Sequence, residues 1–191
     1  MKKAEISLQT KMRLAASLKK FMQKKSFEKI TVSEILEDCD IARPTFYYHF
    51  KDIYDLLEWT FENEVLDLLM QSKNLSTWKD GLLLSLNYII ENKKFCLCAY
   101  NSLDWRVFDR MLSRIAVPVV KSFIEEIGKD IPAKPEHIDF LADFYTSALA
   151  CIYAKWLSTG MKQTPDEIVE LIYIAIFDNI APALERSAGS Y

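Results

Sequence analysis

Apolar residues recur three and four positions apart along most of this 191-residue chain, with charged residues between them. That spacing is typical of amphipathic α-helices with one buried face. No alternating Val/Ile/Thr pattern indicates a strand, and the chain has only four glycines. We therefore expect an all-α fold of about nine helices. The predicted helices are 10–25, 32–38, 43–51, 52–73, 78–91, 95–103, 104–127, 136–158 and 165–184.

Residues that start or interrupt helices stand at several of these boundaries. Asp52 is expected to cap the fourth helix, and Ser76 or Thr77 the fifth. Pro118 lies inside the seventh helix and is expected to kink or divide it. Thr164, followed by a proline and two acidic residues, is a strong start for the last helix.

One stretch, residues 31–51, differs in character from the rest of the chain. It begins with a short amphipathic helix, for which Thr31 is the expected N-cap. Asp40 is then expected to adopt the left-handed conformation of a tight turn. A second short helix follows, with Pro44 in its first turn, Phe46 as a buried anchor and many hydrogen-bonding side chains. Helix, turn and polar second helix form the helix-turn-helix plan.

Charge is distributed unevenly between the two ends of the chain. Residues 1–51 contain eleven Lys/Arg and six Asp/Glu, a net charge of +5, whereas residues 52–191 contain thirteen and twenty-one, a net charge of −8. A basic N-terminal part on an acidic remainder suits a protein that meets phosphate with one end only. Because lysines on helix surfaces are usually just solvated, the asymmetry by itself is a weak signal.

Four short segments stand out within residues 27–57: Ile30-Thr31-Val32, Thr45-Phe46-Tyr47, His49-Phe50-Lys51 and Leu56-Leu57. Through these segments, residues 27–57 resemble the DNA-binding module of the TetR/AcrR family of transcriptional regulators. The resemblance implies a helix-turn-helix DNA-binding domain at 1–51 and a helical effector-binding and dimerisation domain at 52–191. It also implies a ligand-responsive regulator, by default a repressor, that binds palindromic double-stranded DNA as a homodimer and is released by a small molecule.

The candidate DNA-contacting residues lie in and around the second short helix. Tyr47 and Lys51 are expected to bind phosphate and fix the register of the protein on DNA. Arg43 and Tyr48, with their neighbours, are expected to face base edges or thymine methyl groups. The whole set is Thr31, Ser33, Arg43, Pro44, Thr45, Tyr47, Tyr48, His49 and Lys51.

The chain departs from the family pattern at four positions. The turn commonly contains Gly and then Ser, where this chain has Asp40 and Ala42. The residue before the threonine of the recognition helix is commonly Gly, and here it is Pro44. The fourth helix commonly starts with a Lys that reaches phosphate, and here that residue is Ile53. The loss of one cation should weaken DNA binding and lower its salt dependence.

These departures keep open a second class of function. A co-regulator with the same fold would act through protein–protein contact without binding DNA directly. Residues 43–47 and 55–59 loosely resemble a branch linked to dihydroxyacetone kinase regulation, in which such a role is conceivable. DNA binding remains the leading interpretation because the basic N-terminal part and the helix-turn-helix agree.

The eighth and ninth helices carry more apolar surface than a solvated helix should. Residues 168–177 are apolar almost all round, which predicts burial on more than one side. The simplest partner is the same helix pair of a second copy, in an isologous four-helix interface. The alternative is burial against the chain's own helices four to seven. The candidate interface residues are Phe140, Phe144, Ala148, Ile152, Ile168, Leu171, Ile172, Ala175 and Ile176.

Aromatic residues are frequent in the middle helices. Pockets between helices are mostly apolar with a few polar groups, so these side chains are candidates for an effector site. Aromatic residues at helical spacing more often fill a core. Family resemblance, rather than the pattern, implies the small-molecule effector. The candidates are Trp59, Tyr88, Tyr100, Trp105, Phe108, Tyr145 and Tyr153.

Other function classes find no support in the sequence. The four cysteines show neither a disulfide framework nor metal-ligand spacing, and they are interpreted as small buried hydrophobes in a reducing cytoplasm. No Gly-rich phosphate loop and no nucleophile–base–acid constellation indicates catalysis. No run of 18 uncharged apolar residues and no signal-peptide core is present. We expect a cytoplasmic regulator that is not an enzyme and uses no metal or cofactor.

Overall fold

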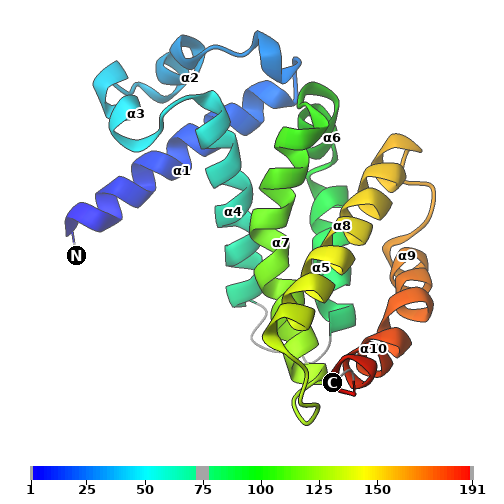
Figure 1. Ribbon diagram of the computed structural model, residues 1–191. Helices are drawn as coiled ribbons and strands as arrows, with labels where there is room; N and C mark the ends of the chain where they lie inside the picture. Colours follow the sequence, from blue (N-terminus) through cyan, green and yellow to red (C-terminus); the bar gives the residue numbers. More distant parts are fainter. Residues whose placement is uncertain (1, 72–77, 190–191) are drawn as a thin grey trace. The chain divides into compact units, whose positions relative to one another are not determined.

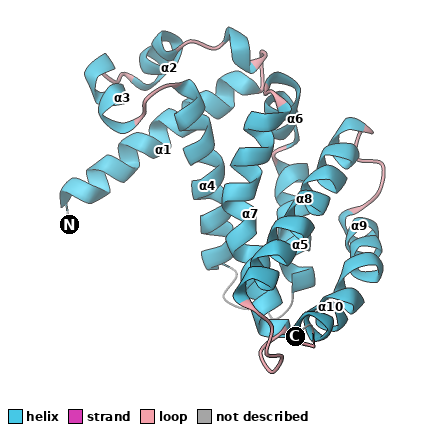
Figure 2. Ribbon diagram, viewed as in Figure 1, coloured by secondary structure: helices cyan, strands magenta, loops and turns pink. Residues whose placement is uncertain are grey.

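The computed structural model describes residues 2–71 and 78–189 of the chain. Every regular element in these ranges is helical, which confirms the all-α prediction (Figure 2). The chain forms two compact units that alternate along the sequence. Residues 1–71 and 91–103 form the first, which we call the head unit, and residues 72–90 and 104–191 form the second, the body unit. The boundary of the DNA-binding function at residue 51 stays a prediction.

The head unit is built around α1 (Lys2–Met22), which contacts α2, α4 and α6 (Figure 1). This helix begins eight residues before the predicted start because residues 2–9 contain neither glycine nor proline. The Thr10 hydroxyl donates to the carbonyl oxygen of Ile6 at 3.0 Å, inside the helix. The other elements of the unit are a 3₁₀ turn (Phe27–Lys29), α2 (Val32–Cys39), α3 (Arg43–His49), α4 (Ile53–Gln71) and α6 (Lys93–Ser102).

The apolar faces of these helices form the core of the head unit. Leu14 comes from α1, Ile35 from α2, Phe46 from α3 and Leu56 from α4, and each is fully buried. Burial of a side chain of this size stabilises the fold by about 1.5–3 kcal/mol. Phe46 therefore ties the short α3, which has few backbone hydrogen bonds of its own, to the rest of the unit.

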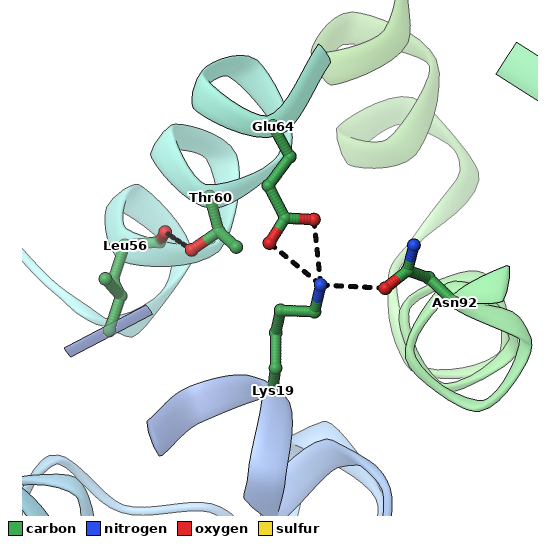
Figure 3. Close-up of polar contacts among 5 residues, drawn as sticks. All are labelled: Lys19, Leu56, Thr60, Glu64 and Asn92. Carbon is green, nitrogen blue, oxygen red and sulfur yellow. Dashed lines mark hydrogen bonds and ion pairs between the residues drawn. The ribbon is translucent and has the colours of Figure 1, made fainter. Parts of the chain in front are cut away.

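A polar cluster joins three segments of the head unit, as Figure 3 shows. The Lys19 ammonium of α1 donates at 2.8 Å to both carboxylate oxygens of Glu64 on α4 and to the side-chain oxygen of Asn92, just before α6. An ammonium group has three N–H donors, and these contacts use all three. The Lys19 nitrogen also lies 5.1 Å from the ring centroid of Phe95, within cation–π range. This one charge therefore holds α1, α4 and the start of α6 together.

Lys19→Met is expected to lower the free energy of unfolding by about 1–3 kcal/mol, because the poorly solvated Glu64 carboxylate loses a charged donor. Urea unfolding followed by circular dichroism measures the effect. The control is Lys20→Met, because the side chain of Lys20 is 53% exposed in its ion pair with Asp38. That change should cost less than about 1 kcal/mol. Equal losses in the two variants would contradict the special role of Lys19.

The body unit holds the remaining helices, and several boundaries need correction. α5 has its predicted bounds, whereas α6 begins two residues earlier than predicted because only Asn92 separates it from α5. The predicted caps at Ser76 and Thr77 lie outside the described residues. The helices of the body unit are α5 (Trp78–Glu91), α7 (Trp105–Ile127), α8 (Pro135–Ser158), α9 (Pro165–Ile172) and α10 (Asp178–Ala188).

Two prolines lie inside helices without ending them. α7 continues through Pro118, so of the predicted kink or division the division does not occur, and α10 continues through Pro182. A proline leaves the carbonyl four residues earlier without its N–H partner. Both prolines are exposed. Since residues four apart share a helix face, the unpaired carbonyl lies on the solvent side and can bind water.

A π-helical turn (Tyr173–Phe177) joins α9 to α10 and resolves the unusual apolar pattern of residues 168–177. Five buried residues recur every four positions along residues 168–184. In an α-helix each four-residue step overshoots a full turn by about 40°, so the fifth residue would point about 160° away from the first. The wider π turn removes much of this drift, and one side of the segment stays in the core. The five residues are Ile168, Ile172, Ile176, Ile180 and Leu184.

Candidate nucleic-acid interface

The start of α2 is fixed by a reciprocal pair of hydrogen bonds. The backbone N–H of Glu34 donates to the Thr31 hydroxyl at 3.3 Å, and the backbone N–H of Thr31 donates to the Glu34 carboxylate at 2.9 Å. This capping box satisfies two backbone donors and confirms the predicted cap. A hydrogen bond from Lys25, with those from Thr31, lowers the pKa of Glu34 to about 2. Thr31 is therefore occupied in shaping the helix, although its position leaves it exposed.

The turn between α2 and α3 has the geometry that the sequence predicts. Asp40 has φ +49° and ψ +52°, the left-handed region, and the N–H of Ile41 donates to the carbonyl of Leu36 at 3.1 Å. Asp tolerates this conformation better than most residues with a side chain. Ala42 is the N-cap residue of α3 and provides no side-chain cap. The family's usual glycine is thus replaced at little cost, whereas the usual serine cap is missing.

Two buried rings decide which side of α3 faces outward. Phe46 and Phe50 are buried, and their centroids lie 5.8 Å apart. The exposed side chains of the helix are then Arg43, Pro44, Tyr47 and Tyr48, with Thr45 and His49 half-buried. Tyr48 is the most open of them at 76% exposure. The predicted DNA-contacting residues of α3 therefore form one accessible surface, joined at its end by the exposed Lys51.

Arg43 is held in place by residues of two helices. Its guanidinium donates to the Ser33 hydroxyl of α2 at 3.3 Å and to the Tyr47 hydroxyl of α3 at 3.2 Å. Its central carbon also lies 5.5 Å from the centroid of the Tyr47 ring. The exposed Ser33 thus meets the recognition helix through Arg43.

Lys11 and His49 define the charge at the end of α3. The Lys11 ammonium lies 5.6 Å from the ring centroid of Phe50 and 5.4 Å from that of Trp59. Burial, and then the positive charge of Lys11, lower the pKa of His49 from its ordinary value. This shift favours the neutral imidazole in the free protein, in which one ring nitrogen can donate a hydrogen bond and the other can accept one.

The start of α4 is closed by two carboxylates. Asp52 accepts hydrogen bonds from the N–H groups of Tyr54 and Asp55, each at 2.9 Å, which confirms it as the cap. The Asp55 carboxylate accepts from the N–H of Lys51 at 2.9 Å. Free N–H groups at a helix start are a ready-made phosphate site, and here carboxylates occupy them. With Ile53 in the family's lysine position, this part of the surface is poor in phosphate-binding groups.

Ile53→Lys is therefore expected to strengthen DNA binding. One added phosphate contact should raise the magnitude of the salt slope, d log K/d log [salt], by about one unit. Fluorescence anisotropy at several salt concentrations measures the slope, with Ile53→Met as the uncharged control. An unchanged slope in the lysine variant would show that the start of α4 does not approach the DNA backbone.

The candidate effector residues do not belong to one unit. Trp59 and Tyr100 lie in the head unit, where the Trp59 ring packs 5.8 Å from that of Phe50. Tyr153 shares a 2.7 Å hydrogen bond with Ser85, and burial raises its pKa to about 12. Trp105 is exposed at the start of α7. The candidates within the body unit are Tyr88, Trp105, Phe108, Tyr145 and Tyr153.

The candidate dimerisation residues divide into an inner and an outer set. Ile168, Ile172 and Ile176 are buried in the core of the body unit, so the expectation that they face a partner needs correction. Ala148 and Ile152 are half-buried. The outer set is exposed, with exposed fractions of 67% for Phe140, 56% for Phe144 and 58% for Leu171, and Ala175 is exposed as well. Ile174 is also exposed, although it is not among the residues predicted from the sequence. The four-residue spacing of the buried set is the signal that separates the two.

The described residues offer no evident place for a metal. Within residues 2–71 and 78–189 no group of three His, Cys, Asp or Glu side chains is arranged to hold an ion. All four cysteines are unbridged, and burial raises the pKa of Cys96 to about 12. In the same ranges, no helix is sufficiently long and apolar to cross a membrane.

Comparison with known proteins assigns both parts of the chain. Residues 14–59 match the family described as "Bacterial regulatory proteins, tetR family", and residues 76–178 match the "Transcriptional regulator C-terminal region". A curated relative is the HTH-type dhaKLM operon transcriptional activator DhaS of Lactococcus lactis subsp. lactis strain IL1403. It is 37% identical over 89 residues, which is 47% of this chain and 48% of the relative. The alignment thus spans about half the length of that relative.

Solved structures with the same fold cover nearly the whole chain. The dihydroxyacetone kinase operon activator DhaS has a TM-score of 0.65 at 23% identity, over 93% of this chain and 97% of that one. A TetR transcriptional regulator from Streptococcus agalactiae 2603V has a TM-score of 0.60 at 21% identity, over 92% of this chain and 98% of that one. RolR in complex with its ligand resorcinol has a TM-score of 0.56 at 18% identity, over 98% of this chain and 97% of that one.

Proposed function

This chain belongs to the TetR family of bacterial transcriptional regulators, and from that premise we propose that it binds palindromic operator DNA as a ligand-responsive homodimer. Its family consists of transcription regulators, so it is not an enzyme. The observation that carries the proposal is the outward surface of α3, on which Arg43, Tyr47 and Tyr48 project from a helix anchored by Phe46.

The α3 helix is proposed to lie in the major groove. In helix-turn-helix proteins the first residues of the second helix contact base edges. Arg43 and Pro44 occupy those positions, and Tyr48 is open enough to reach a thymine methyl group. Tyr47 and Lys51 are proposed to bind phosphate, which positions the protein without reading sequence. His49, half-buried at the end of α3, is proposed to add a hydrogen bond to DNA.

The body unit is proposed to form the dimer. Phe140 and Phe144 stack on each other, with centroids 6.3 Å apart, on the exposed side of α8. Leu171 and Ile174 project from α9 and the π turn. Exposed apolar side chains of this size, when they gather on one face, are the usual mark of a protein interface, and we propose that these four lie in one. A two-fold symmetric pair would place two α3 helices in successive major grooves, about 34–36 Å apart.

An effector and the sign of regulation complete the proposal. We propose a small molecule that binds among the aromatic side chains of the body unit, and a cytoplasmic location. RolR, with the same fold, binds resorcinol in its solved structure. The family resemblance favours repression, whereas the DhaS relative is an activator. Transcription in vitro from a promoter that carries the operator, with and without protein, separates the two.

A co-regulator without direct DNA contact is the second candidate. The Asp52 and Asp55 carboxylates at the start of α4, beside Ile53, favour it because they remove a phosphate site. Selection of bound fragments from a genomic DNA pool decides between the candidates. Enrichment of palindromic fragments supports the DNA-binding regulator. Absence of any enriched fragment, with the dimer intact, would favour the co-regulator.

A further inference from the structure

The contacts of Arg43 point to more than general attraction for DNA. Arg43 is the first residue of α3, and its side chain is exposed. Its contacts with Ser33 and Tyr47 use two of the five N–H donors of a guanidinium. The remaining donors suffice for a bidentate contact with an acceptor pair.

A side chain held in this way has lost part of its rotational freedom before it binds. Its position over the Tyr47 ring, 5.5 Å from the centroid, and the hydroxyls on two helices restrict where the guanidinium can point. Ordering a long side chain at an interface otherwise weakens binding, so a pre-ordered arginine favours a contact with fixed geometry. Because Arg43 is the first residue of α3, the base edges of the major groove are within its reach, and they offer such geometry.

We propose that Arg43 reads a guanine in each operator half-site, through bidentate hydrogen bonds to its O6 and N7 in the major groove. Guanine is the base that presents two acceptors side by side there, and arginine is its usual partner. Tyr47 can serve Arg43 and DNA together, because its oxygen accepts from Arg43 while its O–H donates to phosphate. This inference rests on the proposed DNA-binding function and names the base that the function requires.

The test starts with selection of duplexes from a random pool by the wild-type protein and by Arg43→Gln. Glutamine pairs with N6 and N7 of adenine, so the variant should prefer adenine at one position per half-site where the wild type prefers guanine. At that position, guanine-to-adenine replacement should weaken wild-type binding by about 5- to 150-fold. Replacement by 7-deazaguanine, which lacks N7, should weaken it about tenfold.

The control is Lys51→Gln, which removes a proposed phosphate contact. It should weaken binding to all selected duplexes by a similar factor and leave base preference unchanged. If Arg43→Gln behaves like this control, Arg43 contacts phosphate and the inference is overturned. If the wild-type protein selects no duplex at all, the DNA-binding proposal itself has failed, which is a different result.

Discussion

Replacing Phe144 and Leu171 together with glutamate is expected to give a monomer that binds its operator about 10²- to 10⁴-fold more weakly. Both side chains are more than half exposed in the single chain. The charges should therefore leave the fold of the body unit intact, but a dimer interface would have to bury them without partners. A monomer engages one half-site at a time and loses the gain in effective concentration that linked half-sites provide.

Multi-angle light scattering and operator titration test this prediction together. The control carries Asn87→Glu and Gln163→Glu, which add the same charge at exposed polar positions of the body unit. It should remain dimeric and bind DNA like the wild type. If the variant with both Phe144 and Leu171 replaced is still a dimer, the dimer interface lies on another surface.

Phe46→Ala is the second change with a large expected effect, a loss of about 3–5 kcal/mol in the free energy of unfolding. Phe46 is fully buried and contacts the rings of Tyr47 and Phe50 at centroid distances of 5.3 and 5.8 Å. Its loss leaves a cavity beneath the recognition helix. Because α3 has only seven residues, tertiary packing rather than its own propensity holds it in place.

Urea unfolding measures this effect, and Tyr48→Ala provides the contrast. Tyr48 is 76% exposed, so its truncation should change stability by less than about 0.5 kcal/mol. It should nevertheless weaken binding to selected DNA, since its ring belongs to the proposed reading surface. A Phe46→Ala variant as stable as the wild type would mean that α3 is not fixed by the core of the head unit.

Local chemistry made much of the helix-turn-helix predictable from sequence. The Thr31 and Asp52 caps, the left-handed Asp40 and the proline in the first turn of α3 are all confirmed. Each depends on hydrogen bonds or dihedral angles within four residues, which the sequence states directly. The outward surface of α3 follows in the same way, because Phe46 and Phe50 define the opposite side.

Packing between distant segments was harder to predict. The segment 91–103 belongs to the predicted effector and dimerisation domain at 52–191, yet it packs in the head unit. Helical periodicity predicts which face of a helix is apolar, but it does not predict which other helix of the chain covers that face. For the same reason Trp59 appeared as an effector candidate, although its ring packs against Phe50.

The outer surface of the last helices shows a second limit. On an ideal α-helix, the apolar residues of 168–177 point in almost every direction, which is why the sequence predicts a segment that is apolar all round. The π turn at Tyr173–Phe177 keeps Ile172 and Ile176 inside while Leu171 and Ile174 face outward. Such turns depend on how the whole helix fits its core, so composition alone does not predict them.

We expect the surface of α3 to bind operator DNA, and a comparison of two duplexes shows whether it does. Fluorescence anisotropy compares the DNA upstream of the protein's own gene with a scrambled duplex at about 50 and 200 mM salt. We expect binding that prefers the upstream duplex, falls steeply as salt rises and is weakened by Tyr48→Ala. Equal, feeble binding to both duplexes, unaffected by Tyr48→Ala, would contradict this expectation at this site.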